Sequence, residues 1–477
     1  MITITRRQAR RLRGVLRRHT LGIPHRGPVS PFVLHARGAE LRAFHRCGAV
    51  AIEFVDSIAP GSHESIALPL DALAEFEGRD DSPVTLETLA PDRTCVRWTD
   101  RGVPQSRAYA VQSLDAIEPS PEPPTSWATI PAEILKTLAE ASETASEDSA
   151  RYALGCIRLG GETGAVAATD GRQLLIHGGF RFPWTDEVLI RRSPLFACPG
   201  LPRDQPVEVG RTGSHVVLKV GPWTLFLEIQ TEGRFPDLGR VVPAPATAAT
   251  RLKLDPDDAR FLGAALDRLP GAAESHAPVV LELNGKAAVR ARGADQAQAT
   301  ELVLARSTYS GAPVRLDTNR KFLSRALRLG FSEIEIVDAE SPVVCRGRDL
   351  VFCWQPLSKD EAADPIADAS HVYSIISIDP TAVEAAVATT MRTTVSEPRE
   401  STESHEPIRV PAAAETQEPA GLAALIREAE SLHQTLTDAR ARAARVAAAL
   451  RRHRRRERLV DATLASLRAL KLQDVVG

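Results

Sequence analysis

Arginine is concentrated at the start of the chain. Residues 1–38 contain no acidic side chain, although the whole protein has a net charge of only −2. Clustered guanidinium groups attract phosphate oxygens, so this segment predicts local binding of a polyanion. The alternative is a solvated helix face with scattered ion pairs. The arginines of this segment are Arg6, Arg7, Arg10, Arg11, Arg13, Arg17, Arg18, Arg26 and Arg37.

Motifs for covalent or metal chemistry are absent from the sequence. It contains no P-loop, no recognisable pair of catalytic carboxylates and no nucleophile elbow. The six cysteines form no CxxC pair, and no His/Cys cluster has the spacing of a zinc site. We therefore expect a protein that is not an enzyme and uses no metal or cofactor. Its thiols are expected to be reduced and mostly buried, with disulfide pairing as the alternative.

Hydropathy gives an expectation about the compartment. No apolar run approaches the ~20 residues that a membrane span needs. Residues 1–19 carry arginine where a signal peptide has its apolar core. Hydrophobic residues make up 43% of the chain and charged residues 25%, as in ordinary globular proteins. We expect a cytoplasmic protein without a membrane partner.

Three short motifs combine turn residues with apolar side chains. The first is ATDGRQL at 168–174, which follows RYALG at 151–155. The second is EGRFPDLGRVVP at 232–243. The third is ESPV at 340–343, followed by VFCWQPL at 351–357. Taken singly each is ordinary, because Asp-Gly favours a hairpin turn and proline stiffens a loop.

The elements that must position these motifs occur in three similar stretches, 1–119, 127–243 and 250–357. Each runs through a short strand, an amphipathic helix, alternating segments with Gly-rich turns, a second short helix and more strands. This order predicts an α+β fold of three repeated domains, each with two helices packed on curved antiparallel sheets. Proline-bearing linkers at 118–126 and 243–250 separate the stretches. The edge strands of such units can join edge to edge.

Two local details refine the helix predictions. In the third stretch, Asp255 is expected to cap a helix that has Pro256 at its first position. In the second stretch, Pro194 and the pair Pro199-Gly200 interrupt the second helix. That helix is therefore expected to be truncated.

The three motifs, in this order and within this repeat, resemble those of the bacterial DNA polymerase III beta subunit, the sliding clamp. The resemblance covers residues 1–357 and is clearest in the second and third stretches. It implies a head-to-tail homodimer that closes into a ring of six sliding-clamp domains around double-stranded DNA. Such a ring binds DNA independently of sequence, is handled by a clamp loader, and serves as a processivity factor that tethers DNA polymerase and other partners.

The resemblance also implies a groove between the second and third stretches that takes a short peptide from a partner. The alternative for Leu154, Leu174 and Val241 is that they are core residues. Two departures from the family pattern bear on the groove, because Arg172-Gln173 stands where His-Arg is common and Gln355 stands where methionine is common. The groove is expected to accept a different peptide, or none. The matching residues are Leu154, Thr169, Gly171, Arg172, Leu174, Pro236, Arg240, Val241, Gln355, Pro356 and Leu357.

Basic residues on the helices of a clamp attract DNA phosphates. In this chain the first helix and the second helix of the third stretch are basic, whereas the other candidate helices are neutral or acidic. A clamp-fold paralogue that does not encircle DNA and acts as a regulatory or scaffold protein through its tail is therefore the rival hypothesis. The side chains expected to face DNA are Arg6, Arg7, Arg10, Arg11, Arg13, Arg17, Arg18, Arg26, Arg320, Lys321 and Arg325.

The tail after the third stretch has a different composition. Residues 358–419 are rich in Ala, Glu, Thr, Ser and Pro and predict a flexible linker, within which 371–379 is either a docked strand or a binding motif. Residues 420–477 place apolar side chains at spacings of three and four, typical of a coiled-coil-like helical extension. That extension either folds back or pairs with another chain. Its basic run 451–458 either contacts DNA or is solvated.

Overall fold

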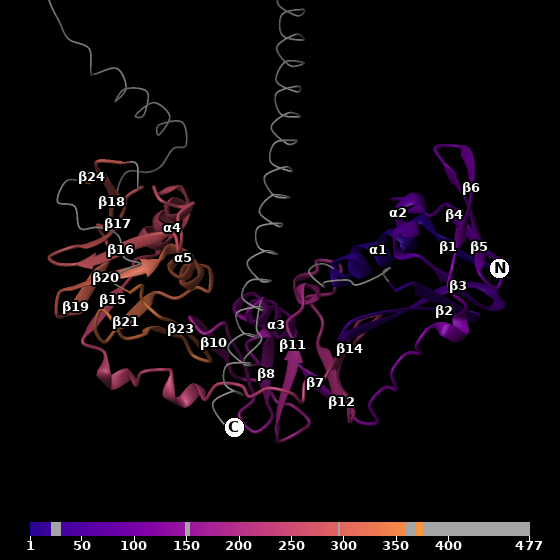
Figure 1. Cartoon of the computed structure of the whole chain (residues 1–477), viewed down its shortest axis with the longest axis horizontal. Coiled ribbons are helices and arrows are strands. Elements are labelled where there is room, and N and C mark those ends of the chain that lie inside the picture. Colours follow the sequence, from indigo (N-terminus) through magenta and orange to yellow (C-terminus); the bar gives the residue numbers. More distant parts are fainter. Residues whose placement is uncertain (21–29, 148–152, 294–295, 359–368, 375–477) are drawn as a thin grey trace, which may run out of the picture. The chain divides into compact units, whose positions relative to one another are not determined.

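The architecture is α+β, rich in sheet with few helices, and it confirms the predicted fold class. The described residues belong to one compact unit, Met1–Val383. The predicted helical extension 420–477, most of the predicted linker 358–419 and Arg26 lie outside the described residues. The computed structural model describes residues 1–20, 30–147, 153–293, 296–358 and 369–374 (Figure 1).

Residues 1–119, called module 1, form a four-stranded sheet and a long hairpin. Leu12, Val15 and Leu16 are buried at helical spacing, so α1 packs one face on the core and leaves arginines on the others. The register of the hairpin shifts between Gly38 and Glu40, which divides each long strand into two halves. The elements are β1 (Ile2–Thr5), α1 (Arg6–Thr20), β2 (Phe32–Cys47), β3 (Val50–Leu68), α2 (Leu73–Phe76), β4 (Pro83–Ala90), β5 (Arg93–Asp100) and β6 (Val103–Ala110).

Residues 127–243, called module 2, repeat this order. The second helix is truncated as predicted, to the short 3-10 helix Pro194–Ala197, which Ser193 caps through a hydrogen bond from the Leu195 amide. The remaining elements are β7 (Ala128–Ile130), α3 (Glu133–Thr144), β8 (Cys156–Gly160), β9 (Ala165–Thr169), β10 (Gln173–His177), β11 (Glu187–Arg191), β12 (Val207–Arg211), β13 (His215–Val220) and β14 (Trp223–Glu228).

Residues 250–357, called module 3, repeat it again, with β19 as an addition. Asp255 caps α4 as predicted, because its Oδ1 accepts a hydrogen bond of 2.8 Å from the Asp257 amide. The elements are β15 (Thr250–Lys253), α4 (Pro256–Ala265), β16 (Pro278–Leu283), β17 (Ala287–Ala291), β18 (Ala299–Val303), β19 (Thr308–Gly311), β20 (Val314–Asn319), α5 (Arg320–Arg328), β21 (Glu333–Ile336), β22 (Val343–Arg346) and β23 (Leu350–Trp354).

One strand, β24 (Ala369–Tyr373), comes from the tail and pairs parallel with β18. The docked-strand interpretation of the segment beginning at His371 is therefore confirmed for its first three residues. The strand begins two residues earlier than the sequence pattern predicted.

Neighbouring modules share sheets. β3 of module 1 pairs antiparallel with β14 of module 2, and β10 of module 2 pairs antiparallel with β23 of module 3. Edge-to-edge joining is thus confirmed at both junctions. The four sheets have the strand orders β1-β4-β5-β6, β2-β3-β14-β13-β12-β7, β11-β8-β9-β10-β23-β22-β21-β15-β19 and β20-β16-β17-β18-β24.

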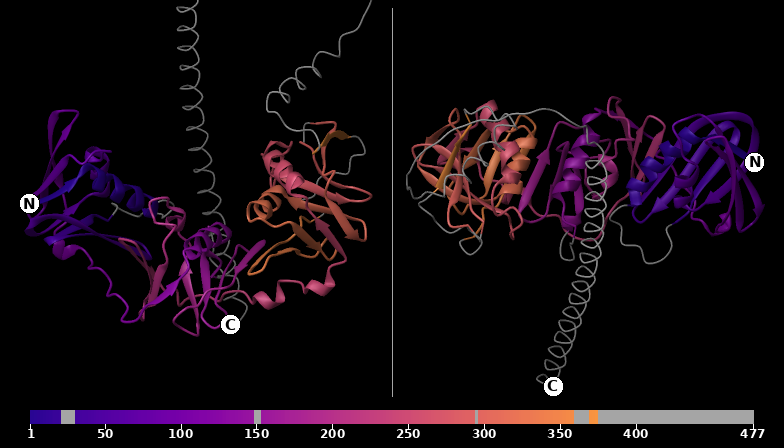
Figure 2. Two further views of the ribbon diagram at one scale, coloured as in Figure 1. Left: turned by 180° about the vertical axis from the view of Figure 1, so that it is seen from behind. Right: turned by 90° about the horizontal axis from the view of Figure 1, so that it is seen from above.

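Helices, like strands, make contacts both within a module and across the module junctions. Within modules 1 and 3 the two helices pack against each other, α1 on α2 and α4 on α5 (Figures 1 and 2). Between modules, α1 packs against Pro194–Ala197 of module 2, where Arg18 Nε lies 3.5 Å from the Pro194 carbonyl oxygen. In the same way α3 contacts α5, through hydrogen bonds from Arg325. At each junction, the first helix of one module meets the second helix of the next.

Candidate functional site

Acidic neighbours neutralise several arginines of α1. Arg7 makes a bidentate ion pair with Asp81 at 2.9 and 3.0 Å, and Arg13 donates to Glu77 at 2.6 Å. Arg11 lies over the Phe54 ring, with its guanidinium carbon 5.1 Å from the ring centre. These arginines stabilise module 1 as well as carrying charge.

Arg6 is largely buried in contacts within module 1, which argues against the prediction that it faces DNA. Its side chain is only 12% exposed. The guanidinium donates to the carboxylate of Asp100 and to the carbonyl oxygens of Glu77 and Thr99, all at 3.0 Å. An arginine at the first position of α1 is thus used to fasten the helix to the β5–β6 end of its module.

The charge that α1 presents to solvent is smaller than the sequence suggested. Arg10, Arg17 and Arg18 are exposed. Within the described residues, Arg10 and Arg17 make no ion pair, and Arg18 contacts only the Pro194 carbonyl. Positions 10 and 17 are two helical turns apart and so lie on one face. This face is the remaining candidate for a phosphate-contacting surface in module 1.

Two of the three predicted basic residues of α5 are core residues, and their assignment to DNA is wrong. Arg320 is 1% exposed and Arg325 is 4% exposed. The Arg320 guanidinium donates to backbone carbonyl oxygens around the end of α4 and the start of β16. The carbonyl oxygens of Leu266 and Ala277 also accept backbone hydrogen bonds, and the arginine adds a buried donor to the whole group of acceptors. Lys321, next in sequence, is exposed as predicted.

Arg325 fastens module 3 to module 2. Its Nη2 donates to the Glu140 carbonyl at 2.6 Å and to the Thr144 hydroxyl at 2.8 Å. Arg328 pairs with Glu143 at 2.8 Å on the same two helices. Burial acts to raise the pKa of Glu143, but the hydrogen bond from Arg328 and the charge of Arg325 outweigh it, so that pKa is lowered. The carboxylate of Glu143 on α3 therefore serves the junction.

The ATDGRQ motif builds a tight turn between β9 and β10. The Thr169 hydroxyl donates to the Gln173 carbonyl at 2.6 Å and accepts from the Gly171 amide at 3.0 Å. Asp170 Oδ1 accepts from the amides of Arg172 and Gln173, both at 2.8 Å. Gly171 has φ +89°, a conformation that L side chains rarely adopt. The motif thus has a structural role whatever binds beside it.

Leu174 lies in a small separate core and not on a surface. It is 1% exposed and belongs to a cluster with Leu238 and Cys353. For this residue the core interpretation is favoured over the groove. The cluster, which also contains Ala167 and Val344, lies between the sheet shared by modules 2 and 3 and the loop that carries Leu238.

The other predicted groove residues differ in exposure. Val241 is 41% exposed and Arg240 is 88% exposed, with its Nε 3.2 Å from Asp237. Leu154 and Pro236 are half-buried, whereas Pro356 and Leu357 are buried. The Leu154 side chain approaches Gly171, within 3.7 Å of where a Cβ would stand.

The predicted residues from modules 2 and 3 meet at one point. The Gln355 amide donates to the Arg172 carbonyl at 2.8 Å, across the junction. The Gln355 side chain is exposed and donates through Nε2 to the Glu340 carbonyl at 2.6 Å. The side-chain amide that replaces the expected methionine therefore has a hydrogen-bond partner within the protein, although it is exposed.

Sequence reasoning missed Phe235 and Leu238, which bring the second motif onto the sheet. Leu238 is buried and Phe235 is half-buried in the same cluster as Leu174. Arg158 lies over the Phe235 ring, 5.5 Å from its centre. The sequence did offer a sign of this packing, because two large apolar residues stand three positions apart in an otherwise polar, proline-bearing loop.

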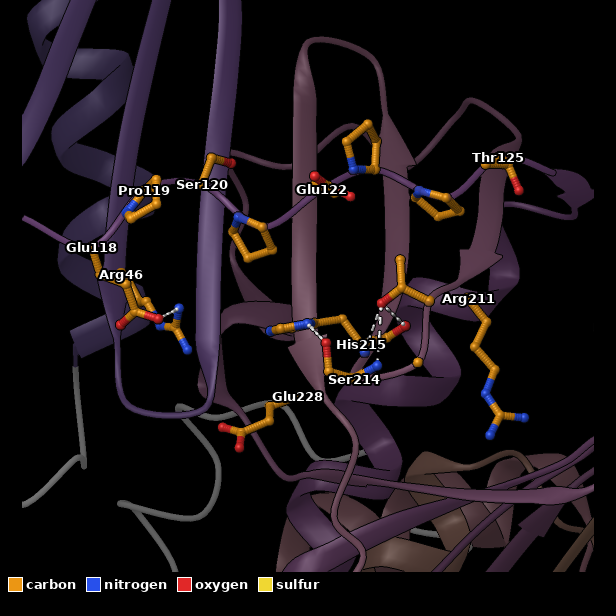
Figure 3. A pocket seen from close by; sticks show the side chains of 15 residues that line it. Arg46, Glu118, Pro119, Ser120, Glu122, Thr125, Arg211, Ser214, His215 and Glu228 are labelled. Carbon is orange, nitrogen blue, oxygen red and sulfur yellow. Dashed lines mark hydrogen bonds and ion pairs between the residues drawn. The ribbon is translucent and has the colours of Figure 1, made fainter.

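A surface pocket of about 790 Å³ lies elsewhere, between the linker after module 1 and the β12–β13 hairpin (Figure 3). Arg46 pairs with Glu118 at its rim, and Ser214 bonds His215 Nδ1 at 2.8 Å. Burial lowers the pKa of His215. None of the predicted site residues lines this pocket.

All six cysteines are buried and free, as predicted. In the described part of the chain, no group of His, Cys, Asp or Glu side chains could hold a metal ion. Over the same residues, no helix is both long and apolar enough to cross a membrane.

No protein-family model matches this chain, and no curated protein matches it. Solved structures do match it. The DNA polymerase III subunit beta of Pseudomonas aeruginosa aligns with a TM-score of 0.63 and 19% identity, over 75% of this chain and 99% of that one. The DnaN sliding clamp of Bartonella birtlesii (TM-score 0.62, 17% identity) and the DNA polymerase III beta chain of Streptococcus pneumoniae (0.61, 15%) cover the same shares.

The alignments span nearly the whole length of each clamp, and the resemblance noted in the sequence is confirmed at the level of fold. The aligned region includes the three sequence motifs and both module junctions. This chain has the fold of the bacterial DNA polymerase III beta subunit, the sliding clamp.

Proposed function

We propose that this protein is a DNA sliding clamp: a non-enzymatic, cytoplasmic, head-to-tail homodimer that encircles duplex DNA and tethers a DNA polymerase. In this proposal modules 1, 2 and 3 are three clamp domains, and each copy contributes three domains to a ring of six. A clamp loader opens the ring for DNA. The tether acts by raising the effective concentration of the polymerase at the DNA.

One observation carries the proposal: both internal junctions use the same pair of edges. At each, a strand at one end of a module pairs antiparallel with the last strand of the next module, β3 with β14 and β10 with β23. The same position in module 3 is β18, and the same position in module 1 is β6. A second copy can pair with β6, and with β18 in place of β24, by repeating the junction head to tail.

Exposed basic residues support the DNA part of the proposal. Arg10, Arg17 and Arg18 on α1 and Lys321 on α5 are exposed. A few cations of this kind give a diffuse, salt-sensitive attraction to phosphates, which suits a ring that slides. Because the ring is a topological link, it needs little affinity for DNA.

The partner site of the proposal is the surface around Val241, Arg240 and Gln355. These side chains are exposed at the junction of modules 2 and 3, whereas Leu174 below them is part of the core. An exposed apolar side chain flanked by polar groups suits the capture of a short peptide.

Loading onto nicked circular DNA tests the proposal. The protein, loaded with its cognate clamp loader and ATP, should stay on the circle in high salt and should leave when the DNA is cut to a linear form. A protein that dissociates from circular and linear DNA at the same rate would sink the proposal.

A second candidate is a clamp-fold protein that does not encircle DNA and acts as a scaffold through its tail. It is favoured by two observations: β24 pairs with β18, and Arg320 and Arg325 are buried. Sedimentation of the chain with and without its tail distinguishes the two candidates, since a protein that stays monomeric in both forms cannot form the ring.

A further inference from the structure

The strand of the tail lies on one particular edge. The register shift divides β2 and β3 into halves, and these four halves correspond in order to β8, β9, β10 and β11 of module 2. Residues 50–57, the first half of β3, therefore correspond to β10. In module 3 the corresponding strand is β18, the last of the series β20-β16-β17-β18. β3 and β10 at these positions each pair with the next module. β18 pairs instead with β24.

The opposite edge, in module 1, is open. β6 corresponds to β14 and β23, both of which join a neighbouring module. β6 pairs only with β5 among the described residues, and every one of its residues except Tyr109 is exposed. An exposed eight-residue edge presents unpaired amides and carbonyls to any strand that fits.

Side chains as well as backbone hold β24 in place. The Ser374 amide donates to the Val303 carbonyl at 3.1 Å, and the Ala305 amide donates to the Ser374 hydroxyl at 3.0 Å. His371 Nδ1 lies 2.9 Å from Glu301 Oε1. Glu301 is fully buried and also pairs with Lys286 and Arg290. β24 therefore completes the shell around a buried carboxylate.

The hold of β24 is nevertheless weaker than a module junction. β24 pairs over five residues, as each module junction does, but it pairs parallel, whereas both junctions are antiparallel, the slightly more stable arrangement per residue. Val372 and Tyr373 remain 38% and 47% exposed, so they add little burial. A longer antiparallel strand has the means to displace it.

We propose that residues 369–374 are a removable plug of the self-association edge: β24 occupies β18 and competes with β6 of a second copy. This inference rests on the head-to-tail dimer of the proposed function. The chain is a monomer while the plug is seated, and the ring closes only when the plug leaves. Control of self-association then lies in the tail, outside the three modules.

Proline substitutions in the full chain test the plug. In a parallel pair, alternate residues present both backbone groups to the neighbouring strand. Because Ser374 donates to β18, Val372 also faces β18, whereas the amide of Tyr373 points away. V372P should therefore unseat β24 and tighten self-association in sedimentation by about tenfold or more. Y373P is the matched control and should behave like the wild-type protein, because an outward amide tolerates proline.

A disulfide that fixes β24 on β18 tests the same proposal from the other direction, since it should prevent self-association. Thr300 and Ser370 are direct partners in register, so T300C/S370C places two cysteines at a separation that a disulfide can bridge. The native cysteines are all buried and do not compete. The oxidised protein should remain monomeric at concentrations where the wild-type protein associates, and reduction should restore wild-type association.

Amide hydrogen exchange of residues 299–303, measured together with the oligomeric state, shows whether β18 has a strand partner in each variant. Dimeric V372P with monomeric Y373P supports the plug. A wild-type dimer in which 299–303 and 369–373 both stay protected as in the monomer, while the ring is retained on circular DNA, overturns the plug and leaves the clamp standing. Exposed 299–303 amides in a V372P protein that stays monomeric overturn both proposals.

Discussion

Trp223 and Phe54 face each other across the junction of modules 1 and 2. They are direct partners in the β3–β14 register, and their ring centres are 4.6 Å apart. Both side chains are fully buried. An aromatic pair of this kind adds to the burial of two large apolar side chains at the point where two sheets become one. The junction is thus built like the interior of a domain.

Removing the Trp223 ring should therefore loosen the junction. Trp223→Ala is expected to cost about 3–5 kcal/mol of unfolding free energy, the usual loss for a large aromatic core residue. Denaturant unfolding measures it, and amide exchange in β3 and β14 should rise. Trp184→Ala, which truncates a half-buried tryptophan, is the control and should cost less. Equal losses for the two variants would contradict the special role of the junction.

The two buried arginines of α5 should act on stability and not on DNA. Arg320→Met removes the side-chain donor to buried carbonyl oxygens, including those of Leu269 and Pro270, and should cost about 3 kcal/mol or more. Thermal unfolding measures the loss. Lys321→Met, at the exposed neighbour, is the control and should leave the melting temperature within about a degree or two. Loss of DNA binding by a folded Arg320→Met protein would revive its assignment to DNA.

Arg10 and Arg17 should contribute to DNA affinity in proportion to their phosphate contacts. Each change to serine is expected to reduce the slope of log affinity against log salt by about one. The salt dependence of binding to a short duplex measures this slope. Arg7→Ser is the control, because Arg7 is already paired with Asp81, and it should reduce the slope less. An unchanged slope in Arg10→Ser/Arg17→Ser would place DNA on another surface.

Stability near β18 should depend on acid pH through Glu301. Burial opposes its ionisation, yet hydrogen bonds and charge from Lys286 and Arg290 lower its pKa below the usual 4.5. A carboxyl with a lowered pKa in the folded state binds fewer protons there, so its contribution is complete above pH 4.5 and is lost as the pH falls through the lowered value. Melting temperature against pH measures this. Glu301→Gln should flatten that part of the curve.

At the junction of modules 2 and 3, stability and partner binding should separate. Val241→Asp should weaken binding of a polymerase-derived peptide while leaving the melting temperature unchanged, since Val241 is exposed. Leu174→Ala should instead cost about 2–5 kcal/mol, as expected for a core leucine. Calorimetry and thermal unfolding provide the two measurements. Normal peptide affinity in Val241→Asp would remove this surface from the partner site.

Local features could be predicted from the sequence because local chemistry decides them. The Asp255 cap, the shortened helix at Pro194 and the turn around Gly171 each depend on residues within a few positions. The order of strands and helices likewise follows from periodicity, and its threefold recurrence predicted a fold of repeated α+β units. The motif around Gly171 completed the resemblance to the clamp fold.

Tertiary structure alone decided what the charged and exposed residues do. Arg325 meets Glu140 across 185 positions of sequence, and no local pattern indicates that its charge is used inside the protein. An arginine on an amphipathic helix has the same spacing whether it faces water, a carbonyl or DNA. The pairing of β24 with β18 joins residues 70 positions apart in the Glu301–His371 contact. Which edge a strand covers depends on the edges left free by all the other strands, and that is settled only when the whole sheet has formed.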